Sequence, residues 1–368
     1  MSRVLLSSPL RLTALTTTTI ISAAARHDVP GIAMGILNSS PLRLFSSSTN
    51  KPQAKSPQQR PSEGGGPRLV SYTSNPVPIP DDFLTSSSSS PPPAAAAVSS
   101  HPIDFAASPL PELAGRIAII LRDVLSPAEC ARLISLAEAS VPLRDDTDND
   151  NSGGDGDGVK ASSAAWRPAL VNLGNGLEAP APNYRVSDRI VWDQQDLADR
   201  IWRRCLQADD GLRRTLARVP AGWRDDGKGE WRLKGINRRM RFLRYGPGQY
   251  FKPHCDGPYW YFEEEEEEDG GGGGRREVRT MYTVHLYLND SAAESPTGEG
   301  HVGGATAFLS RDRKRRLDVN PKAGSVLIFQ HEGLLHEGAR VDSGLKYTVR
   351  MDLLYRWEPE QTESSSPA

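Results

Sequence analysis

The sequence has few cysteines, no long apolar run and little net charge, and each shortage excludes a class of protein. Its 368 residues include three cysteines, which lie far apart as Cys130, Cys205 and Cys255. They lack the spacing of a disulfide framework or a structural zinc site. No apolar run approaches the ~18 residues needed to span a bilayer. The formal net charge of −2 gives no overall reason to expect a nucleic acid or an acidic surface as partner.

Acidic residues are almost absent from the start of the chain. Residues 1–62 contain seven lysines and arginines, many serines and threonines, and Asp28 as their one acid. This composition is typical of an organellar transit peptide. The stretch Arg43-Leu44-Phe45-Ser46 resembles a mitochondrial cleavage site, so we expect a mitochondrial protein. A disordered tail on a cytoplasmic protein is the alternative.

Composition also divides the rest of the chain. Residues 63–112 are dominated by serine, proline, alanine and glycine, and such a stretch is expected to be a linker. We expect one folded domain over residues 113–358 and a disordered tail over 359–368. In the first half of this domain, the residues from Ser126 to Glu129 have the pattern of a capping box that begins a helix.

Two further segments of this half suggest structure without chemistry. The residues from Gln194 to Leu206 have the apolar spacing of a second helix. Residues 145–158 are rich in aspartate, but the glycine and glutamate that a calcium loop needs at its sixth and twelfth positions are missing. We expect a solvated loop there.

The second half of the domain reads as a succession of short strands separated by turns. This spacing, over residues 238–357, favours an all-β sandwich or barrel over βαβ units. Residues 263–274 interrupt it with six glutamates, one aspartate and five glycines. An acidic, glycine-rich insert of this kind predicts a flexible extension of a hairpin.

The stretch His254-Cys255-Asp256 is the strongest chemical signal in the sequence. Alternate side chains of a strand share a face, so an imidazole and a carboxylate would project together. With one more histidine they would form the 2-His-1-carboxylate triad of non-heme Fe(II) sites, which leaves positions open for oxygen and a cosubstrate. By the same alternation, Cys255 is expected to face the core.

Four other histidines of the folded domain could complete the triad, namely His285, His301, His331 and His336. A dicarboxylate cosubstrate that chelates iron at one end needs a fixed cation at the other. Lys346 follows His336 by ten residues, enough for a turn and a return on the adjacent strand. The corresponding residue for His331 is Arg340, which falls in a turn. This difference favours His336.

Several stretches together resemble the 2-oxoglutarate and Fe(II)-dependent dioxygenases, in the prolyl 4-hydroxylase-like group. They occur in the expected order as RFLRYGPGQYFKPHCDG, HLYLND, GGATAF, NPKAGSVLIF and LLHEGARVDSGLKYTVRMDLLY, and a further resemblance lies in RIAIILRDVLSPAECARLISLAE. The resemblance implies an α+β fold, with a double-stranded β-helix (jelly-roll) core and helices packed outside.

The resemblance also implies roles for individual residues. His254, Asp256 and His336 would bind Fe(II), and Lys346 would pair with the far carboxylate of 2-oxoglutarate. The hydroxyl of Tyr245 would bond to that carboxylate, and Thr306 would occupy the threonine position of a Gly-Gly-Glu-Thr motif. The chain departs from this motif at Ala305, which stands where the group has the glutamate. L-ascorbate would be needed to rescue oxidised iron.

These expectations define an enzyme that couples decarboxylation of 2-oxoglutarate to hydroxylation of a C–H bond. A protein or peptide is the expected substrate, with proline as one candidate. The alternatives are a small metabolite, a nucleic acid, which the near-neutral charge disfavours, or an inactive β-helix that serves as a binding module. His285 is expected to line the pocket or to be structural, and Arg350 could bind a substrate anion.

Overall fold

The computed structural model describes residues 66–85, 97–142, 165–174, 176–220, 229–264 and 274–360. The chain divides into two units, residues 1–60 and residues 61–368. The predicted transit peptide and its cleavage site lie outside the described residues, as do the aspartate-rich segment 145–158 and the loop 265–273 of the acidic insert. All that follows concerns the second unit.

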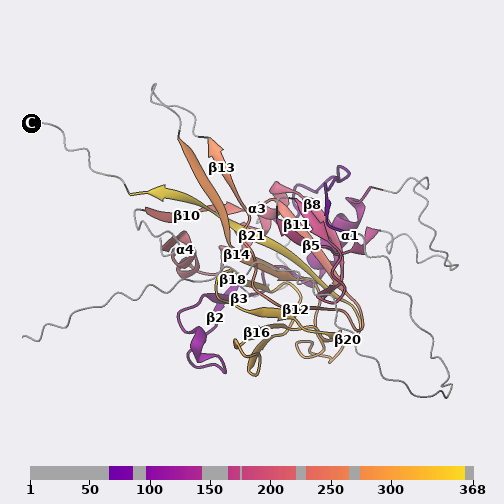
Figure 1. The fold of residues 1–368 in the computed structure, drawn as a ribbon. Coiled ribbons are helices and arrows are strands. Elements are labelled where there is room, and N and C mark those ends of the chain that lie inside the picture. Colours follow the sequence, from indigo (N-terminus) through magenta and orange to yellow (C-terminus); the bar gives the residue numbers. More distant parts are fainter. Residues whose placement is uncertain are drawn as a thin grey trace, which may run out of the picture. The chain divides into compact units, whose positions relative to one another are not determined.

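A large, mostly antiparallel sheet forms the frame of this unit (Figure 1). Its described strands lie in the order β2 (Ser99–Pro102), β3 (Ala118–Arg122), β18 (Val326–Gln330), β14 (Arg275–Tyr287), β21 (Lys346–Pro359), β11 (Arg239–Tyr245), β8 (Asp188–Asp193) and β4 (Arg167–Pro168). Three more are attached at its side, β10 (Gly229–Ile236), β9 (Arg218–Pro220) and β13 (Trp260–Glu264).

A smaller sheet carries much of the predicted site. Its order is β17 (Arg316–Val319), β16 (Thr306–Leu309), β19 (His336–Gly338), β12 (Tyr250–His254) and β7 (Arg185–Val186). Two minor sheets complete the described strands, formed by β1 (Arg68–Leu69), β6 (Leu177–Ala179) and β5 (Val171–Gly174), and by β15 (Val302–Gly303) and β20 (Val341–Ser343).

The two faces of the large sheet bury different partners. One face packs against the helices α1 (Pro127–Ala139), α3 (Gln195–Cys205) and α4 (Asp210–Ala217), which follow the short 3-10 helix η1 (Pro111–Leu113). Between the two sheets, a second apolar cluster includes Tyr287, Phe308 and Phe329. Two facing sheets with helices on the outside confirm the predicted jelly-roll core with flanking helices.

The predicted helix starts have the expected local chemistry. The hydroxyl of Ser126 accepts a bond from the backbone N–H of Glu129 at 3.2 Å, and the Glu129 carboxylate accepts one from the Ser126 N–H at 2.7 Å. This capping box begins α1, as predicted. The second predicted helix is α3, whose buried side includes Ile201 and Cys205.

The expected linker over residues 63–112 is wrong in part, because the described portions of it pack on the domain. Phe83 and Leu84 are buried in the main core, and Leu110 is fully buried in the second cluster. Strand β2 pairs with β3 at the edge of the large sheet. A few apolar residues anchor a stretch whose average composition resembles a linker. The domain therefore begins well before residue 113.

The other end of the domain is close to its predicted boundary. Strand β21 continues to Pro359, which pairs with Gly229. Within the described ranges, no helix is long and apolar enough to cross a membrane.

Candidate active site

A pocket opens between the two sheets, and the residues of the predicted site line it. The large sheet contributes side chains from β11, β14, β18 and β21, and the small sheet contributes side chains from β7, β12, β16 and β19. The lining residues are Arg185, Arg241, Leu243, Tyr245, Phe251, His254, Asp256, Thr283, His285, Thr306, Phe329, His336, Glu337, Gly338, Lys346 and Arg350.

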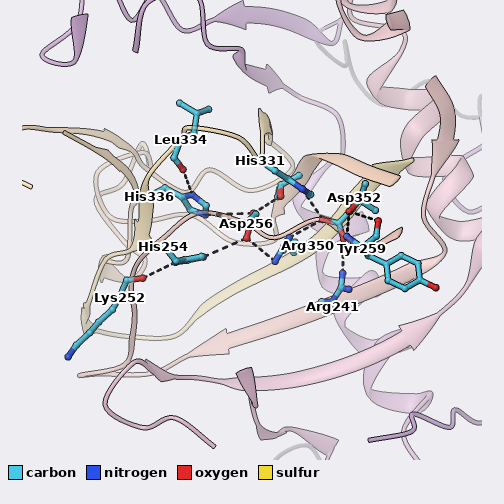
Figure 2. A network of polar contacts seen from close by, with 12 residues as sticks. Arg241, Lys252, His254, Asp256, Tyr259, His331, Leu334, His336, Arg350 and Asp352 are labelled. Carbon is cyan, nitrogen blue, oxygen red and sulfur yellow. Dashed lines mark hydrogen bonds and ion pairs between the residues drawn. The ribbon is translucent and has the colours of Figure 1, made fainter. Parts of the chain in front are cut away.

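Three of these side chains converge as a possible metal centre (Figure 2). One ligand atom from each of His254, Asp256 and His336 lies within 4.8 Å of the other two. The Nε2 atoms of His254 and His336 each lie 3.7 Å from a different carboxylate oxygen of Asp256. The strands β12 and β19 pair directly at the two histidines, which fixes one imidazole beside the other.

Backbone carbonyls orient both imidazoles. The Nδ1 of His254 lies 2.8 Å from the carbonyl oxygen of Lys252, and the Nδ1 of His336 lies 2.9 Å from that of Leu334. Since a carbonyl only accepts, each Nδ1 carries the hydrogen and each Nε2 keeps its lone pair. Two neutral imidazole nitrogens and one carboxylate are the donor set of a non-heme Fe(II) site.

Burial keeps these histidines neutral. Desolvation, together with the neighbouring imidazole of His336, lowers the pKa of His254 to about 3. Desolvation also lowers the pKa of His336. Both rings are therefore ready to donate a lone pair at neutral pH.

Asp256 reaches the site from a loop, and not from a strand as the alternation argument assumed. Strand β12 ends at His254, and the carboxylate is held by two neighbours on the large sheet. The hydroxyl of Thr283 donates to it at 2.6 Å, and Arg350 lies 3.0 Å from its other oxygen. Burial alone would raise the pKa of Asp256, but Arg350 and the histidines hold it well below its usual range.

Arg350 belongs to a buried ionic network behind the site (Figure 2). Its guanidinium also pairs with Asp352 at 3.1 Å, and Asp352 pairs with Arg241 at 2.8 Å. His331 lies 3.5 Å from the same carboxylate, which places this candidate ligand away from the metal group. Arg350 was expected as a candidate for binding a substrate anion, but in the structure two acids of the protein already surround it.

The predicted cosubstrate residues line the other end of the pocket. Lys346 is 2% exposed, and its Nζ donates to the carbonyl of Gly304 at 2.6 Å. It lies 5.3 Å from the ring centre of Tyr245. Burial lowers the pKa of Lys346 to about 7. The hydroxyl of Thr306 accepts a bond from that of Tyr287 at 2.8 Å.

The other residues singled out in the sequence occupy different environments in the structure. His285 is half-buried in the pocket wall, and its buried Nε2 has no hydrogen-bond partner among the described residues. His301 is buried beside Asn289 and outside the metal group. Cys255 is exposed, so the expectation of a core position was wrong. The chain leaves the strand at His254, and the alternation that would turn Cys255 inward no longer applies.

Sequence reasoning missed several residues that support the site. None of Thr283, Arg185, Arg241 and Asp352 was singled out in the sequence. Asp352 and Thr283 are cross-strand neighbours, as are Arg241 and Arg350. Only the register of β21 between β14 and β11 brings these charges together.

Comparisons with known proteins agree with this geometry. Residues 240–351 match the family model of the 2OG-Fe(II) oxygenase superfamily. This segment contains all three residues of the metal group as well as Lys346. No curated protein matches the chain.

Three solved structures are similar at low identity. A viral collagen prolyl hydroxylase from Paramecium Bursaria Chlorella virus-1 is 16% identical, with a TM-score of 0.33 over 66% of this chain and 96% of the other. A prolyl-4-hydroxylase from Pseudomonas putida is 16% identical, with a TM-score of 0.37 over 68% and 99%. A Trichoplax adhaerens prolyl hydroxylase in complex with a hypoxia inducible factor peptide fragment is 13% identical, with a TM-score of 0.32 over 52% and 71%. These values are too low to specify a substrate.

Proposed function

We propose that the chain is a 2OG-Fe(II) oxygenase, the superfamily whose model residues 240–351 match, and that it hydroxylates a C–H bond of a protein or peptide, with proline as the leading target. The observation that carries this proposal is the convergence of His254, Asp256 and His336, whose ligand atoms lie within 4.8 Å of one another. These donors hold the iron and leave positions for 2-oxoglutarate and oxygen. Bound iron with its cosubstrate supplies an oxidising power that no amino-acid side chain has.

The other pocket residues hold the cosubstrate and exclude water. Lys346 pairs with the far carboxylate of 2-oxoglutarate, and the hydroxyl of Tyr245 binds the same group. The anion restores the full charge of a lysine whose pKa burial has lowered to about 7. Thr306, whose hydroxyl accepts a bond from Tyr287 at 2.8 Å, forms part of the pocket wall.

Exposed aromatic rings that follow Asp256 in the sequence support a peptide substrate. Strand β13 begins four residues after Asp256 and exposes aromatic rings, with Tyr259 and Trp260 each 54% exposed and Phe262 45% exposed. Neighbouring exposed rings of this kind mark interaction surfaces. A hydroxylase for small metabolites would have no use for such a surface outside the pocket.

The test is decarboxylation of 2-oxoglutarate by the purified chain with added Fe(II). His336→Ala and Asp256→Ala are expected to lose this activity together with metal binding. His101→Ala is the matched control, since His101 is exposed and bonds only to Ser99 among the described residues. Turnover at the wild-type level in either site variant would contradict the assignment of the iron ligands. Mass spectrometry of proline-containing peptides after turnover then tests the target.

Two further proposals concern the reductant that sustains activity and the location of the protein in the cell. L-ascorbate sustains activity by reducing iron that becomes oxidised in uncoupled turnovers, so its omission should shorten the progress curve. Residues 1–62 direct the protein to mitochondria, where cleavage at the stretch Arg43-Leu44-Phe45-Ser46 removes the residues before it. An intact Met1 on the mature protein would contradict this removal.

A further inference from the structure

Arg185 is unusual among the residues that line the pocket. The other lining residues of the described chain all fall within residues 240–351, the segment that matches the superfamily. Arg185 comes instead from β7, at the edge of the small sheet, where it pairs with Phe251 on β12. The segment that matches the superfamily therefore does not include Arg185. Its role belongs to a property of this particular chain.

The guanidinium of Arg185 is fixed near the metal group. Its Nε donates to the hydroxyl of Ser187 at 3.0 Å, and its guanidinium carbon lies 4.7 Å from the ring centre of Phe251. That ring stacks on the imidazole of His254 with centres 3.7 Å apart. A hydrogen bond with Tyr245 adds a further contact. The ring of Phe251 therefore contacts both the guanidinium of Arg185 and the imidazole of His254, a proposed metal ligand.

The other cations of the pocket already have anions. Arg241 pairs with Asp352 at 2.8 Å, Arg350 pairs with Asp256 at 3.0 Å, and the proposed function assigns Lys346 to 2-oxoglutarate. The acid Glu337 is engaged by Arg316 at 3.2 Å. Arg185 has no acidic partner within 4.0 Å among the described residues.

The environment of Arg185 favours the arrival of an anion. Desolvation lowers the pKa of Arg185, and the nearby cations Arg189 and Arg350 act in the same direction. Arg189 is itself paired with Glu178 at 2.6 Å, so that acid is occupied. Arg185 is half-buried, and a partly desolvated cation without a counter-ion is costly, so a carboxylate of the substrate would reduce that cost.

We propose that Arg185 binds a carboxylate of the substrate, and that the preferred substrate is a peptide with an acidic side chain about two residues from the hydroxylated residue. This inference rests on the proposed function. A guanidinium binds a carboxylate through two parallel hydrogen bonds, which favours arginine for this task. The Phe251 ring centre lies 4.7 Å from the guanidinium carbon of Arg185 and 3.7 Å from the ring centre of His254, so these two groups lie within about two to three residues of extended chain of each other, at ~3.3–3.6 Å per residue.

The experiment uses blocked decapeptides with one proline, and with glutamate, glutamine or lysine two residues before or after it. Their affinities are measured for the full chain loaded with 2-oxoglutarate and Mn(II), which replaces iron without turnover. The glutamate peptide should bind more tightly than the glutamine peptide by about tenfold or more. Arg185→Gln should abolish the difference, Arg185→Lys should retain part of it, and Arg185→Glu should favour the lysine peptide.

The matched control is Arg340→Gln, because the Arg340 side chain is 69% exposed and outside the pocket. Its peptide preference should equal that of the wild type. Equal affinity of the wild type for the glutamate and glutamine peptides, or no binding of either, would overturn the proposal. The proposal would also be overturned if Arg185→Gln bound 2-oxoglutarate more weakly but kept the preference for the glutamate peptide. Arg185 would then bind the cosubstrate and not the substrate.

Two more measurements distinguish this inference from binding of a small free acid and from failure of the proposed function. N-acetylglutamate amide that binds as tightly as the glutamate peptide would overturn the peptide part, because a free small acid would then suffice. Decarboxylation of 2-oxoglutarate without peptide tests the proposed function by itself. A wild type that decarboxylates but has no glutamate preference refutes only the role of Arg185.

Discussion

Arg350 lies 3.0 Å from the carboxylate of Asp256 and 3.1 Å from that of Asp352, so one guanidinium on β21 joins a metal ligand to a second buried acid. Both acidic side chains are 3% exposed. The guanidinium compensates their charge and, with the hydroxyl of Thr283, fixes the orientation of the Asp256 carboxylate. Without metal, Arg350 is therefore a main source of charge balance in the site.

Replacing Arg350 with glutamine should destabilise the metal-free protein. The substitution leaves two buried carboxylates with too little positive charge, and breaking a buried pair in this way costs about 3–5 kcal/mol. Saturating Mn(II) supplies charge to Asp256, so it should stabilise the variant by more than it stabilises the wild type. Urea denaturation with and without Mn(II) measures both effects.

Arg244→Gln provides the comparison for Arg350→Gln. Arg244 pairs with Asp188 at 2.9 Å, but its partner is 24% exposed and lies outside the pocket. A loss of about 1 kcal/mol or less, independent of Mn(II), is expected for this more exposed pair. Equal losses in the two variants would show that Arg350 has no special relation to the metal ligand.

The sequence predicted the parts of the site that depend on residue type and spacing. His336 could be preferred over His331 because Lys346 follows it at the distance of a returning strand, and the structure places His336 beside His254. The capped helix α1 followed from Ser126 and Glu129, since a capping box is a local interaction that needs no tertiary information.

The parts that sequence reasoning missed depend on register and on chain direction. Arg350 meets Asp256 only because β21 lies between β11 and β14 in one particular alignment. Cys255 is exposed because the strand ends at His254, and a strand end cannot be located by alternation alone. Arg185 reaches the pocket from a two-residue strand, which is too short to have a sequence pattern.

The affinity for 2-oxoglutarate should fall as the pH rises above about 7. Burial lowers the pKa of Lys346 to about 7, so a rising pH removes the charge that the cosubstrate requires. Binding must then be accompanied by uptake of one proton, and the affinity should fall about tenfold per pH unit. Calorimetry in two buffers of different ionisation enthalpy measures the uptake. An affinity independent of pH from 6 to 9 would place the anion site elsewhere.

The same lysine should make folding stability depend on pH. In the unfolded chain its pKa returns to ~10.4, so between about pH 7 and pH 10 the unfolded state binds a proton that the folded state does not. Stability without cosubstrate should therefore rise with pH over this range. Lys346→Met removes the titrating group and should abolish that contribution, which denaturation at a series of pH values measures.

Gly304→Ala should weaken 2-oxoglutarate binding while metal binding persists. Gly304 has φ +73°, and a Cβ there would lie 3.1 Å from the Cδ of Lys346 and 3.0 Å from Val341. The carbonyl of Gly304 also accepts the bond from Lys346. Gly298→Ala is the matched control, because its φ is +74° and a Cβ there meets nothing within 4 Å.

Both glycine variants should lose about 1–3 kcal/mol of stability through backbone strain. Only Gly304→Ala should raise the dissociation constant of 2-oxoglutarate, since only there does the new methyl group displace the lysine. Equal cosubstrate affinity in the two variants would mean that the contact with Lys346 is unimportant for binding.

Metal binding should be less sensitive to mild acid than binding at a site of ordinary histidines. A site built from two histidines with the ordinary pKa of ~6.5 would lose roughly a thousandfold in affinity between pH 7.5 and pH 5, because protons compete for both nitrogens. Here burial lowers the pKa of His254 to about 3, so this ring holds no competing proton at pH 5, and burial also lowers the pKa of His336, so protons compete less for its nitrogen than for that of a free histidine. Titration of the full chain with Mn(II) at a series of pH values measures this difference.

The same depressed pKa values should make the fold sensitive to stronger acid. As the pH falls below ~6.5, both histidines bind a proton more readily in the unfolded chain than in the folded one, so the metal-free protein loses stability, and the contribution of His254 to this loss continues down to about pH 3. His254→Gln removes one of these groups and should flatten that loss. A metal affinity that falls steeply below pH 6.5 would mean that the imidazoles titrate as free histidines do, and that the bonds from Nδ1 to the carbonyls of Lys252 and Leu334 do not hold them ready for the metal.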